Sequence, residues 1–124
     1  MIYGCGTDII EISRIKKAAQ KESFLKKVFT DKEIAICRER HNFFASLAVR
    51  FAAKEAVAKA FGTGFRGYGW QDIEILSDSL GKPLVILHNG ALDIAKGQGI
   101  VKLEVALSHS KDNALAFCIA EGSE

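Results

Sequence analysis

The segment 43–61 is the feature that most constrains the fold, and it overlaps the motif RFAAKEAVAKAFGTG at 50–64. Projected at about 100° per residue, small or apolar side chains occupy nearly every side of this helix. A helix with that pattern should be buried. Asn42 is a suitable N-cap, and Gly62 and Gly64 should end the helix. We therefore predict a long, buried helix against which the rest of the chain packs.

The remaining segments alternate between strand and helix patterns. A chain of 124 residues is long enough for one domain, residues 1–124, and too short for two ordinary ones. Thr30 and Glu33 have the spacing of a capping box, which begins a helix reaching about Arg40. We predict the fold class α+β, a mainly antiparallel sheet packed against the long helix, with a hairpin over 101–120. The predicted elements are strands over 2–10 (buried), 71–77, 83–87, 101–108 and 114–120, and helices over 11–20, 23–29 and 89–96.

Composition excludes several classes of protein. The net charge of +2 is too mild to predict nucleic-acid binding, and no apolar run is long enough to span a membrane. The N-terminus lacks the pattern of a signal peptide, so we expect a cytoplasmic protein. The three cysteines are widely spaced, with no CxxC, which indicates neither a disulfide framework nor a zinc site.

Positive charge is concentrated in one short stretch near the N-terminus. Its only acidic residue is Glu22. The stretch is either a solvated helix surface or a face that receives an acidic partner. The basic residues are Arg14, Lys16, Lys17, Lys21, Lys26 and Lys27.

A carboxylate and an ammonium interrupt one apolar row of the long helix. Glu55 lies in the same row as Phe44 and Phe51, and Lys59 follows one turn later. A buried charge is costly unless it is paired, hydrogen-bonded or bound to a metal. One interpretation is an ion pair between Glu55 and Lys59 at the favourable i, i+4 spacing. The other is a functional site.

Asp8 raises the same question in the first strand. In GCGTDIIEI, alternation places Asp8 on one face with Gly4 and Gly6. It is either an N-cap for the helix beginning near Glu11 or a second functional carboxylate. Two buried carboxylates, Asp8 and Glu55, would repel each other unless a cation lay between them.

These residue types together favour magnesium-dependent chemistry. Mg²⁺ is usually held by one or two carboxylates, and substrate phosphates and water fill its other positions. Lys59 would hold a phosphate oxygen, and the amides around Thr63 and Gly64 would do the same in a glycine-rich turn. We therefore predict a reaction on a phosphate or pyrophosphate.

The motif LSHSKDNALAF contains the third unusual group. His109 ends a predicted strand between Ser108 and Ser110. The segment is either a simple polar hairpin end or, at a sheet rim, a donor to phosphate or ribose.

Four motifs resemble those of the holo-[acyl-carrier-protein] synthases, small 4'-phosphopantetheinyl transferases of fatty-acid synthesis. They are GTDIIEISRI, RFAAKEAVAKAFGTG, GKP and LSHSKDNALAF, in the family's order and spacing over nearly the whole chain. The resemblance implies transfer of the phosphopantetheine arm of coenzyme A to a serine of apo acyl carrier protein, releasing adenosine 3',5'-bisphosphate. Asp8 and Glu55 would be magnesium ligands, and Lys59 would contact the transferred phosphate. Glu55 or a magnesium-bound water would remove the serine proton.

The same resemblance implies a binding role for further residues. Arg14, Lys17 and Lys21 would meet the acidic carrier protein. The resemblance to the small members of this family also implies a homotrimer, with active sites that lie between subunits. The residues implied at coenzyme A are Arg50, Gly62, Thr63, Gly64, Lys82, Pro83, Ser108, His109 and Ser110.

Two other functions use the same residues. A magnesium-dependent nucleotide phosphohydrolase would replace the serine hydroxyl with water, but would need no basic docking face. A non-catalytic module that binds coenzyme A or a carrier protein would keep its binding without Asp8 and Glu55.

Overall fold

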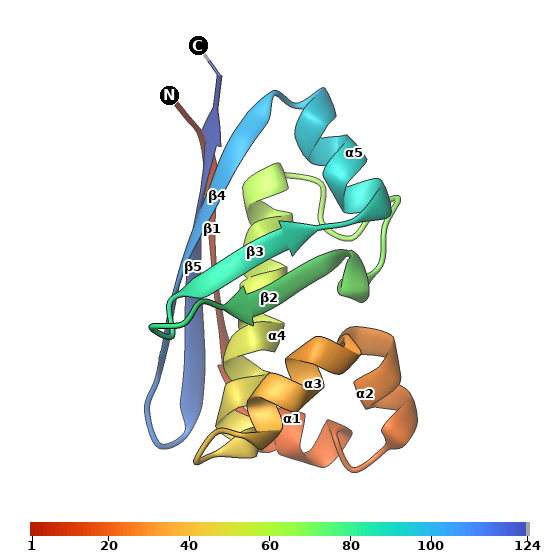
Figure 1. Ribbon diagram of the computed structural model, residues 1–124, viewed down its shortest axis with the longest axis vertical. Coiled ribbons are helices and arrows are strands. Elements are labelled where there is room, and N and C mark those ends of the chain that lie inside the picture. Colours follow the sequence, from red (N-terminus) through yellow and green to blue (C-terminus); the bar gives the residue numbers. More distant parts are fainter. Residues whose placement is uncertain (124) are drawn as a thin grey trace.

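Two antiparallel sheets pack against one long helix in the computed structural model, which describes residues 1–123. Figure 1 shows the long helix α4 beside the upright sheet β1–β5–β4, with the shorter pair β2–β3 crossing in front of the helix. In chain order the elements are β1 (Ile2–Glu11), α1 (Ile12–Ala18), α2 (Glu22–Val28), α3 (Asp31–Arg38), α4 (Phe43–Phe61), the 3₁₀ helix η1 (Trp70–Asp72), β2 (Ile73–Ser77), β3 (Pro83–Leu87), α5 (Asn89–Gly97), β4 (Ile100–His109) and β5 (Asn113–Gly122).

The predicted central helix is confirmed, together with its caps. The Asn42 side chain accepts a hydrogen bond from the Ala45 amide at 3.0 Å, and Gly62 ends α4 in the left-handed conformation with φ of 79°. Thr30 and Glu33 form the predicted capping box at the start of α3, which ends two residues before the predicted Arg40. In residues 1–123, α4 included, no helix combines the length and apolar character needed to cross a membrane.

The first strand lies in direct backbone contact with α4. A Cβ atom added at Gly6 would be 2.1 Å from the Ala56 carbonyl oxygen, and one at Gly4 would be 2.7 Å from the Ala60 oxygen. Only glycine allows this approach, which brings the side chain of the next inward residue, Asp8, beside the helix. The register pairs Asp8 with Ala116 of β5, which in turn pairs with Leu107 of β4.

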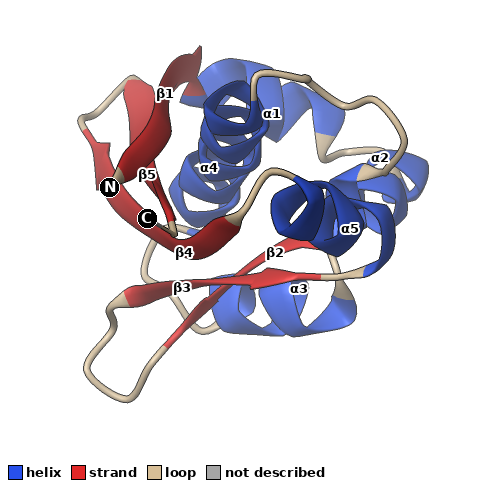
Figure 2. Ribbon diagram, turned by 90° about the horizontal axis from the view of Figure 1, so that it is seen from above, coloured by secondary structure: helices blue, strands red, loops and turns tan. Residues whose placement is uncertain are grey.

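The predicted antiparallel pairing is confirmed, and the strands form two sheets. β1, β5 and β4 make one sheet, while β2 pairs only with β3. The two sheets meet α4 on different sides (Figure 2). Alternation identified each strand correctly, but it carries no information on which strands pair with each other.

The prediction that the first strand is buried is correct for one face only. On the face turned away from α4, Ile9 is 64% exposed, and Leu115 and Phe117 of β5 are about half exposed. Within residues 1–123 no element covers this side of the sheet, because α4 packs against the other (Figure 2). The outer apolar face, as we call it, consists of Cys5, Thr7, Ile9, Leu115, Phe117 and Ile119.

A fully buried ion pair joins α4 to α3 and β2, and the sequence did not predict it. Lys54 and Glu33 are both 0% exposed, with Nζ 2.9 Å from Oε1. Lys54 also donates to the carbonyls of Trp70 and Ile73, and Glu33 accepts from the amides of Thr30 and Ile75. Every charge in this pair is therefore matched by hydrogen bonds, as a buried ion pair requires.

Candidate active site

Asp8, Glu55 and Lys59 meet where β1 crosses α4. The Lys59 ammonium donates to the carbonyl of Thr7 at 2.9 Å and to Oδ1 of Asp8 at 3.2 Å. Glu55 precedes Lys59 by one turn, so both lie on the side of α4 that faces β1. The structure thus brings together the three residues predicted to carry the chemistry.

Two of the simpler interpretations of these residues are wrong. Among the ion pairs within residues 1–123, Lys59 pairs with Asp8 across the contact between strand and helix, and not with Glu55. Asp8 does not cap a helix either. β1 continues through it to Glu11, which occupies the N-cap position of α1 without a side-chain bond.

The site is more open than two buried carboxylates would imply. The Asp8 side chain is 18% exposed and that of Lys59 is 53% exposed, and Glu55 is half-buried. Burial raises the pKa of Glu55, the nearby Asp8 charge raises it further, and Lys59 lowers it in part. Negative charge is therefore in excess on a surface that a ligand can reach.

This donor set fits a magnesium ion that shares its ligands with a substrate. Within residues 1–123, no third histidine, cysteine, aspartate or glutamate completes a protein-only metal site around Asp8 and Glu55. Two hard carboxylate oxygens with room for phosphate and water are what Mg²⁺ prefers, whereas zinc sites need nitrogen or sulfur ligands. Burial is the main cause of the raised pKa of Glu55 and the Asp8 charge adds to it, and a cation between the two carboxylates would relieve that repulsion.

The glycine-rich turn directly follows the C-terminal end of α4, one turn beyond Lys59. Gly62 and Gly64 both have positive φ, 79° and 62°, and a Cβ at either would meet nothing within 4 Å. The hydroxyls of Thr63 and Tyr68 both donate to the Gly64 carbonyl, at 2.9 and 2.6 Å. The turn is therefore held in a fixed shape one turn beyond Lys59.

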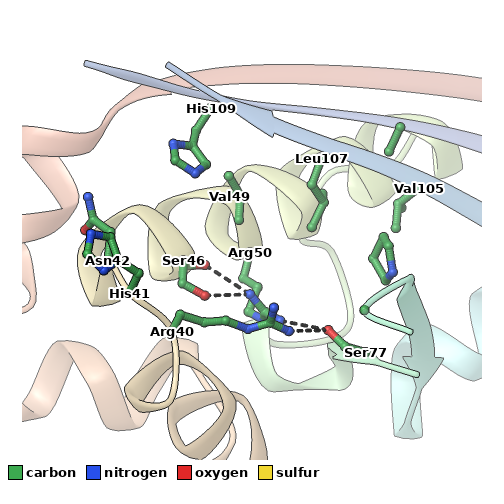
Figure 3. Close-up of a pocket in the computed structure, with 13 residues that line it drawn as sticks. Arg40, His41, Asn42, Ser46, Val49, Arg50, Ser77, Val105, Leu107 and His109 are labelled. Carbon is green, nitrogen blue, oxygen red and sulfur yellow. Dashed lines mark hydrogen bonds between the residues drawn. The ribbon is translucent and has the colours of Figure 1, made fainter. Parts of the chain in front are cut away.

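A cavity of about 750 Å³ lies on another side of α4 (Figure 3). Arg50, Pro83 and His109, three of the residues predicted at coenzyme A, line it together with residues from the β2–β3 turn and β4. The rest of its polar lining was not predicted from the sequence, although the run RERH at 38–41 was a signal for it. Those polar residues are Arg40, His41, Asn42, Ser46 and Ser77.

Arg50 reaches this cavity as a largely buried residue, 4% exposed. Its guanidinium donates to the Ile75 carbonyl at 3.1 Å and to Oγ of Ser46 at 2.8 Å, and both Arg50 and Arg40 donate to Ser77 at 3.2 Å. Figure 3 shows the bonds to Ser46 and Ser77, which fix the guanidinium at the cavity wall. Two cations close to one hydroxyl make this wall suitable for an anion.

The other residues predicted at coenzyme A lie around the cavity or away from it. Ser108 lies on the opposite face of β4 from His109, because side chains alternate along a strand. Ser110 accepts a bond from the Asn113 amide within the hairpin turn. Lys82 forms an exposed ion pair with Glu104 at 3.3 Å. Within one chain, these residues and the Gly62–Gly64 turn do not form one pocket.

The carboxylate site and the cavity lie on different flanks of α4. Arg50 and Glu55 are about 140° apart around the helix, and Lys59 is about 180° from Arg50. On the sheet, Asp8 of β1 and Leu107 of β4 are separated by Ala116 of β5. The body of the helix therefore stands between them.

The predicted docking residues are all on the surface. Arg14 and Lys17 project from α1, and Lys21 lies at the start of α2. All three are exposed, and the ion pairs found within residues 1–123 involve none of them. Their charge is therefore available to a partner.

Comparison with known proteins assigns the family. The family model described as the 4'-phosphopantetheinyl transferase superfamily matches residues 4–118, and the chain therefore belongs to that superfamily. The chain is 51% identical over 123 residues to the holo-[acyl-carrier-protein] synthase of Clostridium tetani, covering 98% of each chain. The predictions of family, α+β fold class and transferase activity are confirmed.

Solved structures give the same result. The holo-[acyl-carrier-protein] synthase of Neisseria meningitidis aligns with a TM-score of 0.89 and 38% identity, covering 98% of this chain and 99% of that one. The enzyme of Bacillus anthracis, solved in complex with CoA (3',5'-ADP), aligns with a TM-score of 0.82 and 34% identity, covering 99% of each chain.

Proposed function

We propose that this chain transfers the 4'-phosphopantetheine arm of coenzyme A to a serine of apo acyl carrier protein, with Mg²⁺, releasing adenosine 3',5'-bisphosphate. The observation that carries the proposal is the cluster of Asp8, Glu55 and Lys59 at the crossing of β1 and α4. A pair of repelling carboxylates beside an ammonium is suited to hold a cation and a phosphate together.

The chemistry requires mainly positioning and charge neutralisation. Magnesium held by Asp8 and Glu55 would neutralise charge that develops on the pyrophosphate. Lys59 would exchange its bond to Asp8 for one to the transferred phosphate. The serine oxygen attacks the phosphorus that carries pantetheine, and the bond to the adenosine bisphosphate oxygen breaks. Glu55 or a magnesium-bound water would remove the serine proton in this proposal.

We propose that a complete coenzyme A site needs two subunits. The carboxylate cluster and the cavity with Arg50, Pro83 and His109 lie on different flanks of α4 in one chain. A neighbouring subunit that presented its cavity to the cluster would unite them, and the outer apolar face provides a surface for such assembly. The arrangement we propose is a homotrimer with three equivalent sites.

The exposed basic residues Arg14, Lys17 and Lys21 form the docking face for the acidic carrier protein in this proposal. Opposite charges on the two proteins would steer their encounter and fix their orientation. We place the reaction in the cytoplasm, where we expect both substrates to be present.

Intact mass spectrometry of apo acyl carrier protein tests the function. After incubation with the chain and coenzyme A, we expect a gain of one phosphopantetheine with Mg²⁺ and no gain with EDTA. Cleavage of coenzyme A without a modified carrier protein would instead indicate a hydrolase. Unchanged coenzyme A and carrier protein, with the chain folded, would contradict the proposal.

Subunit mixing tests the shared site. Glu55→Gln and His109→Ala subunits should each have very low activity alone. Mixed after mild dissociation, they should regain activity, because some interfaces combine an intact carboxylate cluster with an intact cavity. Light scattering should give three times the subunit mass. No recovery in mixed trimers would show that each site lies within one chain.

A further inference from the structure

The glycine-rich loop between α4 and η1, residues 62–69, contains a tyrosine that the proposed mechanism does not use. Tyr68 lies four residues beyond Gly64 and donates its hydroxyl proton to the Gly64 carbonyl at 2.6 Å. The Thr63 hydroxyl donates to the same oxygen at 2.9 Å. Two side chains of one loop thus converge on a single carbonyl in the turn after α4.

The ring of Tyr68 is fixed by packing that does not involve the turn. It packs edge-on against Phe61 with centroids 6.0 Å apart, and against Phe65 at 5.3 Å. Next to it, the first turn of α5 lies against the loop backbone, since a Cβ at Gly90 would be 2.1 Å from the Gly67 carbonyl oxygen. The far half of the loop is therefore anchored to the body of the protein.

The near half of the loop is held by hydrogen bonds: the Gly62 amide donates to the Lys59 carbonyl at 3.0 Å, and the Thr63 and Tyr68 hydroxyls donate to the Gly64 carbonyl. Gly62 and Gly64 have positive φ, and a Cβ at either position would find nothing within 4 Å. Glycine in open space is free to change conformation. The bond from Tyr68 connects the Gly62–Gly64 turn to the anchored half of the loop, and this turn directly follows the helical turn that carries Lys59, the predicted phosphate contact.

The tyrosine hydroxyl also remains a donor at neutral pH. Burial raises the pKa of Tyr68, and the nearby charge of Glu55 raises it further, although Thr63 lowers it in part. The proton shared with the Gly64 carbonyl is therefore retained under working conditions.

We propose that Tyr68 is a positioning residue for coenzyme A, which acts by holding the Gly62–Gly64 turn in its binding conformation through the Gly64 carbonyl. The inference rests on the proposed function, in which that turn contacts coenzyme A. Because the hydroxyl touches the turn and not the reacting atoms, its loss should weaken binding of substrate and transition state equally.

Tyr68→Phe, which keeps the ring and removes the hydroxyl, tests the proposal. We expect the Kd and KM for coenzyme A to rise about five- to tenfold, the usual effect of one hydrogen bond, with kcat within about twofold. Hydrogen exchange should become faster in residues 62–65. The matched control is Tyr3→Phe, because Tyr3 is the chain's other tyrosine and lies on β1.

Thr63→Val provides a second measurement through a double-mutant cycle. Because both hydroxyls hold the same carbonyl, we expect the effects of Tyr68→Phe and Thr63→Val on the Kd for coenzyme A to be non-additive. Unchanged Kd in Tyr68→Phe would overturn the inference, as would a lower melting temperature and kcat with KM unchanged, which is the result of a merely structural role. Both outcomes are distinct from failure of the proposed function, which would appear as no transfer by the wild-type chain.

Discussion

Lys54 and Glu55 are neighbours on α4, yet their surroundings are opposite. Lys54 is 0% exposed and all its charge is matched by Glu33 and two carbonyls. Glu55 is half-buried, repelled by Asp8, and directed to a surface that a ligand can reach. A saturated buried pair holds elements together, whereas an unsatisfied group on an open surface is poised to bind something. Two adjacent residues of α4 therefore carry charges with different roles, structural for Lys54 and, in our proposal, functional for Glu55.

The largest effect should come from breaking the saturated pair. Lys54→Met leaves the Glu33 carboxylate buried without its cation, so we expect a loss of about 3–5 kcal/mol in the free energy of unfolding. Urea denaturation measures it. The double variant with Glu33→Gln should recover part of the loss, because the stranded charge is removed. Near-wild-type stability of Lys54→Met would break the comparison.

Glu55→Gln should have the opposite effect, a loss of activity with little loss of stability. It removes a charge and the proposed metal ligand without changing packing volume, so we expect kcat to fall about 100- to 1,000-fold with little change in melting temperature. Steady-state transfer and thermal unfolding provide the two readouts. A variant that kept most of its activity in Mg²⁺ would show that Glu55 is not a metal ligand.

Exposed charges should affect the partner and not the fold. Reversing both Arg14 and Lys17 to Glu should raise the KM for the carrier protein about tenfold, more at low salt, and leave the KM for coenzyme A unchanged. Lys96→Glu, an exposed lysine in the last turn of α5, is the matched control. A change confined to coenzyme A would place these residues at a different surface.

The smallest expected effect is on how the free energy of unfolding depends on pH, where Glu55 and Lys54 should contribute slopes of opposite sign. The pKa of Glu55 is raised above 4.5, so the folded state holds this proton more tightly than the unfolded state, and stability falls as pH rises above that value. Burial lowers the pKa of Lys54 below 10.5 despite Glu33, so stability rises as pH increases toward that value. Glu55→Gln and Lys54→Met should each remove only their own slope from urea midpoints measured across pH.

Local patterns predicted the elements and the chemistry, but not the long-range pairings. The caps at Thr30, Asn42 and Gly62 depend on neighbouring residues, so they were visible in the sequence. The partner of Lys54 is 21 residues away in another helix. No local pattern links two residues so far apart in the chain, although a lysine within an alanine-rich buried helix indicated that some buried partner must exist.

The candidate site follows the same division. Asp8, Glu55 and Lys59 stood out because charged residues interrupted apolar patterns, and the fold brings them together. The separation of this cluster from Arg50 and His109 depends on which flank of α4 each residue faces, and on the strand order β1–β5–β4. Strand order is a property of the whole fold and cannot be obtained from alternation within each strand.

The contact of Gly6 with Ala56 has a consequence for how freely this sequence can change. The distance from Asp8 to α4 is set by two backbones in contact, with no side chain between them that a compensating change elsewhere could resize. Even one methyl group at position 6 would push the strand from the helix and separate the two carboxylates. Substitutions in the surrounding core can be compensated when neighbouring side chains repack. A substitution of Gly6 cannot be compensated in this way, because it meets backbone atoms. Gly6, which has no side chain, is therefore the position at which this sequence tolerates the least change.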